Sequence, residues 1–463
     1  KGTIPHFILP SLPKMDGDRK SAALRFKVDD KWVELSESQI FKHPGGPVIN
    51  QYAGSDATHI FHAFHAGSAK AYKQLSGIKK SQTLTEIESK ELEASVAKRS
   101  DEADINIAVY DISIEQEKKI VASFEELRQE VIRRGWMEGA PLYCCWKIFE
   151  SFLLLAAVVA LQYNGWFMTS ALVLGLAWQQ LGWIAHEYCH QQPFANRETN
   201  DTIALILANF AQGLSRDWWK DKHNTHHAAT NVVDQDGDIE VVPLFSFIPA
   251  DLKKYKAPIE KFFLQFVPYQ HLYFTLALPL IRYSWVAQSI LFAFTEQNST
   301  YRVYRRNALG EQVALLAHWI AISIQLYYLP DNFTRICYFL ISQSLCGLLL
   351  GHVVTYSHNS VDKYPANSRI LNNFACLQIL TTRNMAPSRF IDWFWGGLNY
   401  QIEHHLFPTM PRCYLNECSK LVKAFCKENG LEYLVDDYTT GYGYNLAQLE
   451  KIAELAEKEA RIA

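Results

Sequence analysis

The stretch MTSALVLGLAWQQLGWIAHEYCH, residues 168–190, runs from apolar residues directly into two histidines, His186 and His190. Two more histidine clusters follow, His223-Asn224-Thr225-His226-His227 and Gln401-Ile402-Glu403-His404-His405, and together the three use seven of the sixteen histidines. On a helix, positions i, i+3 and i+4 share a face, so each cluster aims its imidazoles at one point. A tetrahedral zinc site takes about four ligands, so seven imidazoles predict two metal ions.

Four long apolar runs accompany these clusters, and we interpret them as transmembrane helices over residues 148–164, 168–185, 312–329 and 335–357. Each is close to the ~20 residues that cross a bilayer. Short polar turns at residues 164–166 and 330–332 join the runs into two hairpins. A fifth apolar stretch, residues 262–294, is interrupted by prolines, a histidine and an arginine, and it predicts an in-plane or half-inserted helix.

Topology gives a consistency test of the metal prediction. The first two clusters follow the second span, and the third cluster follows the fourth span. An even number of crossings separates them, so all three emerge on one face of the membrane. Lys and Arg are concentrated on that face, which predicts that it is cytosolic together with both termini.

Composition narrows the class of protein further. The 463 residues predict more than one domain, and 45 basic against 48 acidic residues give no indication of nucleic-acid binding. Nine cysteines without a CxxC pair predict neither a disulfide framework nor a thiolate zinc site. We expect a small unit over residues 24–82, a charged linker over 83–112, and a membrane unit over 113–463 that opens with an amphipathic helix.

The N-terminal unit contains His43-Pro44-Gly45-Gly46, followed by Asp56-Ala57-Thr58 and then by Phe61, Phe64 and His65. This order of elements resembles the cytochrome b5 family. The resemblance implies a small α+β domain that binds haem b, with His43 as one axial ligand and His65 as the other. His62 and His59 lie close enough to remain alternatives for the second ligand. With both axial positions taken by protein, haem transfers electrons rather than binding oxygen.

The first cluster also matches the HExxH signature of zinc metalloproteases, with Glu187 as general base. That interpretation leaves the other two clusters without a function and has no use for a haem electron carrier. A purely structural role for seven histidines beside a bilayer is less probable still, because ionisable groups there are costly.

The pattern HxxxH, HxxHH and QxxHH on four spans behind a cytochrome b5-like unit resembles the front-end fatty acyl desaturases, most closely those of the animal delta-6 type. The similarity extends through WWKDKHNTHHAATN and GGLNYQIEHHLFPTMPR, residues 218–231 and 396–412. It implies an all-α integral membrane domain with four transmembrane helices and a cytosolic helical cap. Gln401 in place of a histidine is characteristic of the front-end group.

The resemblance implies two iron ions that activate O2 with electrons from the haem. The ligands carried over are His186, His190, His223, His226, His227, His404 and His405, with Gln401 as a weaker ligand, either directly or through water. One more histidine is expected at the end of the fourth span, for which His358 matches best and His352 is the alternative. Alkyl C–H bonds are neither acidic nor electrophilic, so their oxidation requires a redox metal.

Charged residues near the clusters suggest supporting roles. The run Asp234-Gln235-Asp236-Gly237-Asp238 has its glycine at the wrong position for an EF-hand, so we expect its carboxylates, with Glu187 and Glu403, to orient histidines. Three cations, Arg216, Lys220 and Lys222, would either hold a phosphate-bearing head group or extend to water as ordinary interfacial charges. Asn445 and Gln448 predict the capping of a final helix over residues 446–462.

These predictions combine into one expectation. The chain is an endoplasmic-reticulum, multi-pass enzyme that inserts a cis double bond at the delta-6 position of C18 polyunsaturated acyl chains, using O2. The acyl donor is a CoA thioester or a phospholipid, and NADH-cytochrome b5 reductase supplies the electrons. The alternatives are a delta-5 desaturase on C20 chains, a sphingolipid desaturase, a lipid hydroxylase, or a membrane-anchored cytochrome b5 that only carries electrons.

Overall fold

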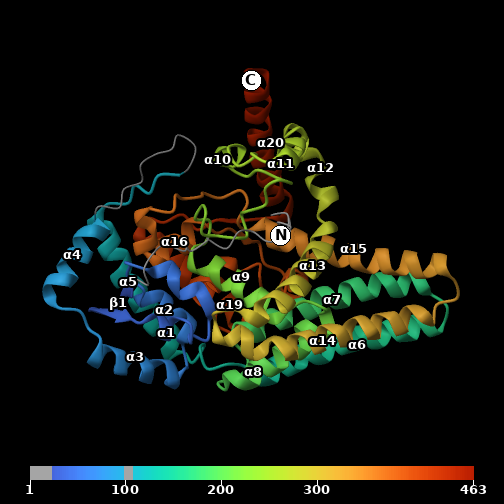
Figure 1. Ribbon diagram of the computed structural model, residues 1–463, viewed down its shortest axis with the longest axis horizontal. Coiled ribbons are helices and arrows are strands. Elements are labelled where there is room, and N and C mark those ends of the chain that lie inside the picture. Colours follow the sequence, from blue (N-terminus) through green and yellow to red (C-terminus); the bar gives the residue numbers. More distant parts are fainter. Residues whose placement is uncertain (1–22, 98–107, 463) are drawn as a thin grey trace.

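A computed structural model describes residues 23–97 and 108–462, and nearly all of its regular structure is helical. Figure 1 shows a bundle of long helices on one side and the N-terminal elements on the other. The histidine-bearing helices lie between them. A separate group of helices, with the C-terminal helix among them, projects from the top of this view.

The described N-terminal elements begin with an antiparallel hairpin of β1 (Leu24–Val28) and β2 (Lys31–Leu35), in which Phe26 pairs with Val33. Alternate residues of β1 are buried, as expected for a strand with one face on a core. Short helices follow and close this core: α1 (Glu37–Ile40), η1 (Gly46–Tyr52), α2 (Thr58–His65) and α3 (Ala69–Ser81). Helix α4 (Glu86–Ala97) occupies part of the expected linker, whose residues 98–107 lie outside the described residues.

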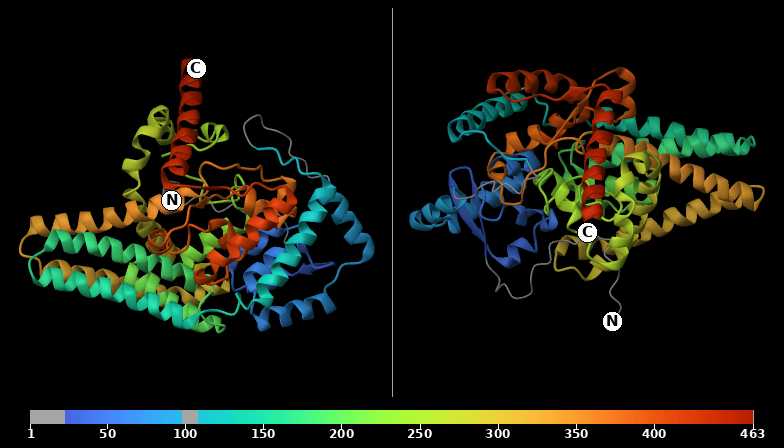
Figure 2. Two further views of the ribbon diagram at one scale, coloured as in Figure 1. Left: turned by 180° about the vertical axis from the view of Figure 1, so that it is seen from behind. Right: turned by 90° about the horizontal axis from the view of Figure 1, so that it is seen from above.

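Four long helices lie side by side in Figure 1 and in the left-hand view of Figure 2. They are α6 (Pro141–Tyr163), α7 (Phe167–Cys189), α14 (Arg302–Tyr327) and α15 (Asn332–Tyr356). Each contains one predicted span. Within the described residues, α6, α14 and α15 are long and apolar enough to cross a membrane. Helix α7 is less apolar because Gln179 and Gln180 lie in its middle, where both are buried against its neighbours. All four predicted spans therefore fall on long helices, and three of these helices are apolar enough to cross a membrane.

The fifth apolar stretch forms α11 (Pro258–Leu264), η3 (Val267–Tyr269), α12 (Gln270–Ala277), α13 (Leu280–Thr295) and η4 (Glu296–Asn298). The chain bends by 86° at the break between α12 and α13, beside Pro279. This shape is that of a broken or re-entrant segment, as the interrupting prolines predict. Helix α13 packs along α15, and the bent pair forms one wall of the cavity described below.

The remaining elements connect the bundle to the histidine clusters. Before the bent segment lie α5 (Ile114–Arg133), α8 (Arg197–Ala204), the π-helical η2 (Leu205–Gln212), α9 (Arg216–Ala228) and α10 (Pro249–Leu252). After α15 lie η5 (Arg369–Asn372), α16 (Phe374–Leu380), α17 (Arg389–Phe394), α18 (Gln401–Leu406), η6 (Arg412–Tyr414) and α19 (Leu415–Asn429). The strands β3 (Asn384–Met385) and β4 (Val435–Asp436) pair in parallel.

The C-terminal helix α20 (Tyr438–Ile462) stands out from the rest of the molecule in Figure 2. It begins eight residues earlier than predicted, and the predicted capping pair was wrong. Asn445 lies inside the helix, where its side chain donates to the carbonyl of Thr355 at 2.8 Å. Asp437 caps the helix instead, since its carboxylate accepts the backbone N–H of Thr440 at 3.0 Å.

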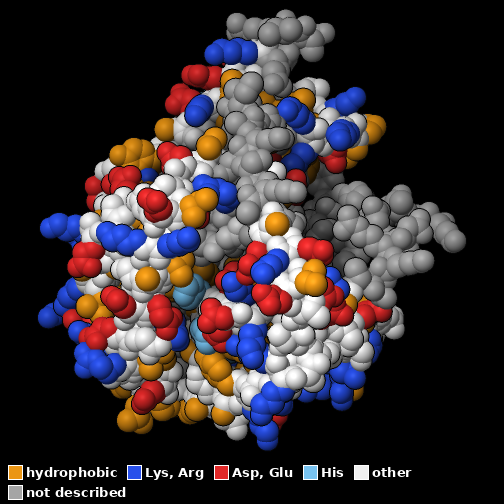
Figure 3. Space-filling model, turned by 90° about the vertical axis from the view of Figure 1, so that its left-hand side faces the viewer, with side chains coloured by type: hydrophobic (Ala, Val, Ile, Leu, Met, Phe, Trp, Pro, Cys, Tyr) orange, Lys and Arg blue, Asp and Glu red, His pale blue; other side chains and the backbone are white. Residues whose placement is uncertain are grey.

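The face that carries the N-terminal elements is drawn in Figure 3. Lys and Arg alternate with Asp and Glu over its described part, with apolar side chains between them. Histidine side chains are visible in a hollow near the centre of this face. The mixed charge agrees with the near-neutral composition of the whole chain.

Candidate metal centre

Four separate chain segments bring the predicted ligands together. His186 lies in the last turn of α7 and His190 just after it, while α9 carries His223, His226 and His227 on one face. Helix α18 begins with Gln401 and carries His404 and His405, and His358 follows the end of α15. Helix α9 starts at Ser215, whose hydroxyl accepts the backbone N–H of Trp218 at 3.0 Å. The local helix geometry therefore aims each cluster at the same interior volume.

The first group of ligand atoms comes from His186, His190, His223 and His404, all within 4.8 Å of one another. The Nε2 atoms of His186 and His223 are 3.2 Å apart. Two imidazoles on one metal ion at about 2 Å place their nitrogens about 3 Å apart. The Nε2 atoms of His190 and His404 are buried without a hydrogen-bond partner among the described residues. A shared metal ion would satisfy all four nitrogens.

The second group comes from His226, His358 and His405. The side-chain amide of Gln401 lies 3.3 Å from Nε2 of His358 and 3.3 Å from Nε2 of His405. The amide nitrogen and oxygen exchange places by a rotation of the side chain, so this position is able to present an oxygen ligand. Gln401 therefore lies where the replaced histidine of the third cluster would have completed the second group.

His227 lies between the two groups. Its Nε2 is 3.1 Å from Nε2 of His223, and its ring stacks on that of His405 at 4.1 Å between centroids. The sequence-predicted histidines thus form two adjacent sets of imidazoles joined by one more. The two groups, with His227 and Gln401, include all nine residues that the sequence predicted as ligands.

Hydrogen bonds behind the histidines fix the orientation of the rings. The carboxylate of Asp236 accepts from Nδ1 of His226 at 2.8 Å, as the sequence predicted for this acidic run. The side-chain oxygen of Gln378 lies 2.8 Å from Nδ1 of His405, and the carbonyl of Thr381 lies 3.0 Å from Nδ1 of His358. Such bonds place the Nδ1 proton outward and leave Nε2 for a metal. Gln378 and Thr381 were missed because nothing in their local sequence distinguishes them from other residues of a buried helix.

Two carboxylates predicted to orient histidines do not do so. Glu187 forms a buried ion pair with Arg412, whose Nη2 is 3.0 Å from it, and Glu403 accepts from Asn384 at 2.8 Å and from Tyr433 at 2.9 Å. Both predictions were wrong because a helical residue adjacent to a ligand points away from the face that carries the ligands. The ion pair also removes Glu187 from the role of general base that a zinc protease requires.

The three cations considered for a head group are engaged in ion pairs. Arg216 is buried and pairs with Asp217 at 2.8 Å and with Glu311 at 3.3 Å. Lys220 pairs with Asp201 at 2.8 Å, and Lys222 pairs with Asp238. These pairs support the helix that carries the second cluster and leave little charge for a phosphate group.

Electrostatics keep most of the ligand set neutral. Burial lowers the pKa of His190, His223, His227, His358 and His405 well below the ordinary value, and lowers that of His404 to about 3. Neutral imidazoles retain the lone pairs that bind a metal. For His226, burial lowers the pKa, but the carboxylates of Asp236 and Asp238 outweigh it and raise the pKa overall. The donor set therefore fits two metal ions.

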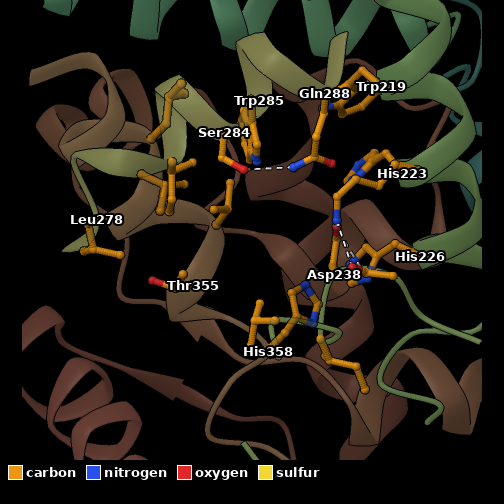
Figure 4. A pocket seen from close by; sticks show the side chains of 18 of the residues that line it. Trp219, His223, His226, Asp238, Leu278, Ser284, Trp285, Gln288, Thr355 and His358 are labelled. Carbon is orange, nitrogen blue, oxygen red and sulfur yellow. Dashed lines mark hydrogen bonds and ion pairs between the residues drawn. The ribbon is translucent and has the colours of Figure 1, made fainter. Parts of the chain in front are cut away.

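A cavity of about 360 Å³ reaches the two groups from the side of α13. His223, His226 and His358 lie at one end of it, as Figure 4 shows, and Leu278 and Trp285 line the part farther from the histidines. Polar groups such as Gln288, which donates to Ser284 at 2.9 Å, occur along the same wall. A largely apolar channel that ends on a metal site suits an alkyl chain.

Other histidines lie away from this centre. His352 faces the C-terminal helix, where Nδ1 is 2.7 Å from the hydroxyl of Tyr438. His318 lies in α14 with Nδ1 2.8 Å from the carbonyl of Phe210. Of the two candidates near the end of the fourth span, only His358 therefore lies with the other predicted ligands in the described part of the chain.

A second pair of histidines lies in the N-terminal elements. The rings of His43 and His65 lie opposite each other, with centroids 6.2 Å apart and an angle of 64° between their planes. Nδ1 of His65 is 2.9 Å from the carbonyl of Phe61, which leaves its Nε2 directed away from the backbone. Both nitrogens of His62 already have partners, Tyr72 and Asp29, each at 2.9 Å. His59 lies 3.8 Å from Glu125 on α5. The geometry therefore favours His65 as the partner of His43.

Comparisons with known proteins agree with this site. Residues 164–436 match a family model described as "Fatty acid desaturase". The chain is 60% identical over 443 residues to a Delta(6)-fatty-acid desaturase of Caenorhabditis elegans, covering 96% of this chain and 99% of that protein. It is 45% identical over 432 residues to a Delta(5) fatty acid desaturase of the same organism, covering 93% and 96%. An Acyl-lipid (9-3)-desaturase of Physcomitrium patens is 32% identical over 455 residues, covering 94% and 78%.

Proposed function

The chain belongs to the fatty acid desaturase family, and on that premise we propose that it forms a cis double bond at the delta-6 position of C18 polyunsaturated acyl chains such as linoleate and alpha-linolenate. The observation that carries the proposal is the pair of imidazole groups at the end of an apolar cavity. The delta-6 position is supported by the 60% identity to a Delta(6)-fatty-acid desaturase, against 45% to a Delta(5) enzyme.

Two iron ions are the metals that this ligand set would hold. The first would bind His186, His190, His223 and His404, the second His226, His358 and His405, with His227 between them and Gln401 beside the second. Imidazole suits iron, and when bound the irons supply the O2-dependent redox chemistry that removes hydrogen from adjacent methylene carbons.

The surrounding residues control access and position. Trp183, Leu278 and Trp285 line the cavity and would exclude water from the acyl chain, which protects the reaction from side products. Asp236, Gln378 and the carbonyl of Thr381 hold three ligand rings in place from behind. The regioselectivity then depends on how far the carboxyl end of the acyl chain is held from the histidines. The residues of α13 and α15 that line the cavity would set that distance.

We propose further that residues 24–82 are a cytochrome b5-like domain in which His43 and His65 ligate haem b. Two imidazoles on opposite sides of one metal ion, at about 2 Å each, have ring centroids about 6 Å apart, and the observed separation is 6.2 Å. A cleft of about 1020 Å³ adjoins His43, although His65 does not line it, and the cations Lys42, Lys70, Lys73, Arg302 and Arg306 surround it. Cations on the His43 side would pair with the two carboxylates of the haem.

The proposed haem and iron sites also suggest how the domains are arranged, in which membrane the protein lies and where its electrons come from. Residues 83–112 would link the haem domain to a desaturase domain over residues 113–463, whose histidine face is cytosolic. The membrane would be that of the endoplasmic reticulum, with both termini in the cytosol and NADH-cytochrome b5 reductase as the source of electrons. A membrane-anchored cytochrome b5 that only carries electrons has no need for two imidazole groups outside the haem unit.

Expression in a yeast without polyunsaturated lipids tests the proposal. Cells fed equal amounts of linoleate and dihomo-gamma-linolenate are expected to form gamma-linolenate, with the new double bond located by mass spectrometry. A His226→Ala variant serves as the negative control and should form no product while its haem spectrum stays intact. New unsaturation at carbon five of the C20 acid alone would contradict the delta-6 assignment and favour the delta-5 alternative.

A further inference from the structure

The N-terminal elements dock directly on the metal-binding helices. The hydroxyl of Tyr52 donates to the carbonyl of Ala228 at 3.0 Å, and Ala228 follows His227 in the chain. The hydroxyl of Thr409 donates to the carbonyl of Ala63 at 3.2 Å. A third contact runs from Arg197 to the carbonyl of Phe64 at 2.9 Å, so that η1 and helix α2 are both held against the segments that carry the histidine groups.

Phe64 makes the aromatic contact of this interface that reaches one of the predicted metal ligands. Its ring meets the ring of His227 edge-on, with centroids 6.1 Å apart and an angle of 88°. This is the separation and angle of a direct aromatic contact. Phe64 is also covalently bonded to His65, and the ring of His65 lies opposite that of His43. One side chain therefore bridges the histidine pair of the N-terminal unit and the imidazole that lies between the two metal groups.

We propose that Phe64 forms the electron route from the haem to the di-iron centre, entering through His227. The inference rests on the function proposed above. With both groups bound, the route would carry one electron at a time from a ferrous haem held by His43 and His65 to a ferric ion held by the histidine groups, and no bond would form or break along it. Two such transfers, with two protons from water, one O2 and the two hydrogens of the acyl chain, give one double bond and two molecules of water.

Phe64 is the favoured route because it leaves the electron only one through-space contact to cross. From the ring of His65 the route follows covalent bonds to the ring of Phe64 and then crosses a single van der Waals contact to His227. An aliphatic side chain of similar size fills most of the same space, but it has no aromatic ring. It therefore leaves a longer distance for the electron to cross to His227. A merely structural role for Phe64 would instead affect stability and leave the transfer rate unchanged.

The test follows oxidation of the haem in the full-length protein, loaded with haem and iron and held in phospholipid nanodiscs. The haem is reduced by the NADH-dependent reductase without oxygen and then mixed with oxygen and linoleoyl-CoA. We expect Phe64→Leu to slow substrate-dependent haem oxidation about tenfold, equal to about 1.4 kcal/mol in activation free energy. Phe64→Tyr, which keeps the ring, should restore the wild-type rate.

Phe41→Leu is the matched control, because Phe41 makes another edge-on ring contact between the same unit and the rest of the chain, with Tyr301 at 5.4 Å. It should oxidise its haem at the wild-type rate. All variants should show the wild-type haem spectrum, iron content and rate of haem reduction by the reductase. A wild-type oxidation rate in Phe64→Leu, or an equal loss in Phe41→Leu, would overturn the route. A wild-type protein whose haem oxidation ignores the acyl substrate would instead overturn the haem function on which the route rests.

Discussion

Replacing Asp236 by asparagine should weaken iron binding at the second histidine group without unfolding the protein. One oxygen of this fully buried carboxylate accepts from Nδ1 of His226 at 2.8 Å and from the backbone N–H of Asn231 at 2.8 Å. The other accepts the backbone N–H of Asp238 at 2.9 Å. An asparagine presents an acceptor on one side only, so at least one buried donor loses its partner.

The magnitude follows from that lost bond. A buried donor without a partner costs about 1–3 kcal/mol, and losing the group that orients a metal-bound histidine weakens metal binding by about 10–100-fold. The two estimates agree, since a tenfold change in affinity is about 1.4 kcal/mol. The carboxylate also raises the pKa of His226, so its removal makes this ring a weaker base and a weaker ligand.

The assay is iron retention by the full-length protein during dialysis against a graded series of chelator concentrations, with the haem spectrum as an internal control. Asp234→Asn is the matched control, because Asp234 lies two residues away on the same loop with its side chain 72% exposed, paired only with Lys254 at 3.4 Å. It should retain iron as the wild type does. Equal iron retention by Asp236→Asn and the wild type would refute the assigned role of Asp236.

Three further predictions concern stability and docking. Arg412→Ala leaves the buried carboxylate of Glu187 unpaired and should lower the free energy of unfolding by about 3–5 kcal/mol. Thermal unfolding in detergent measures this loss, and an unchanged unfolding midpoint would contradict the buried ion pair. Gly46→Ala places a Cβ against the Tyr304 hydroxyl at a φ of +68°, so limited proteolysis should release the N-terminal unit faster. Gly54→Ala, with φ of +67° and open space around it, should not show this effect, and equal cleavage of both variants would argue against docking at Gly46. Removal of iron by a chelator should abolish desaturation and lower the unfolding temperature, while the b-type haem spectrum persists. Desaturase activity that survives chelation would exclude a metal-dependent reaction.

Much of the fold was predictable because apolar periodicity and length are local properties. The long helices appear where the apolar runs predicted them, and the interrupted stretch is bent beside Pro279. Helix α7 contains two buried glutamines, Gln179 and Gln180, and both donate to the carbonyl of Phe394 at the end of α17, a contact that a hydropathy profile does not show. The start of α20 was misjudged because Asn445 finds its partner in Thr355, ninety residues away in the chain.

The histidine centre was predictable to the extent that its spacing is helical. Each cluster lies on one helix or at its end, so the sequence alone aimed the rings correctly. The outer partners were not predictable in the same way. Gln378 and Arg412 approach the centre from elements distant in sequence, and Arg412 takes the carboxylate of Glu187 that a motif would have assigned to catalysis. The roles of such residues depend on contacts between segments that are distant in the sequence. The sequence around each residue does not reveal those contacts.

The most direct test of the central claim is the ratio of non-haem iron to haem in the purified full-length protein. Two imidazole groups joined by His227 predict two non-haem irons for each haem. The same preparation of His226→Ala should lose non-haem iron while its haem content is unchanged. A single non-haem metal per haem in the wild-type protein, or zinc in place of iron, would contradict the two-iron centre.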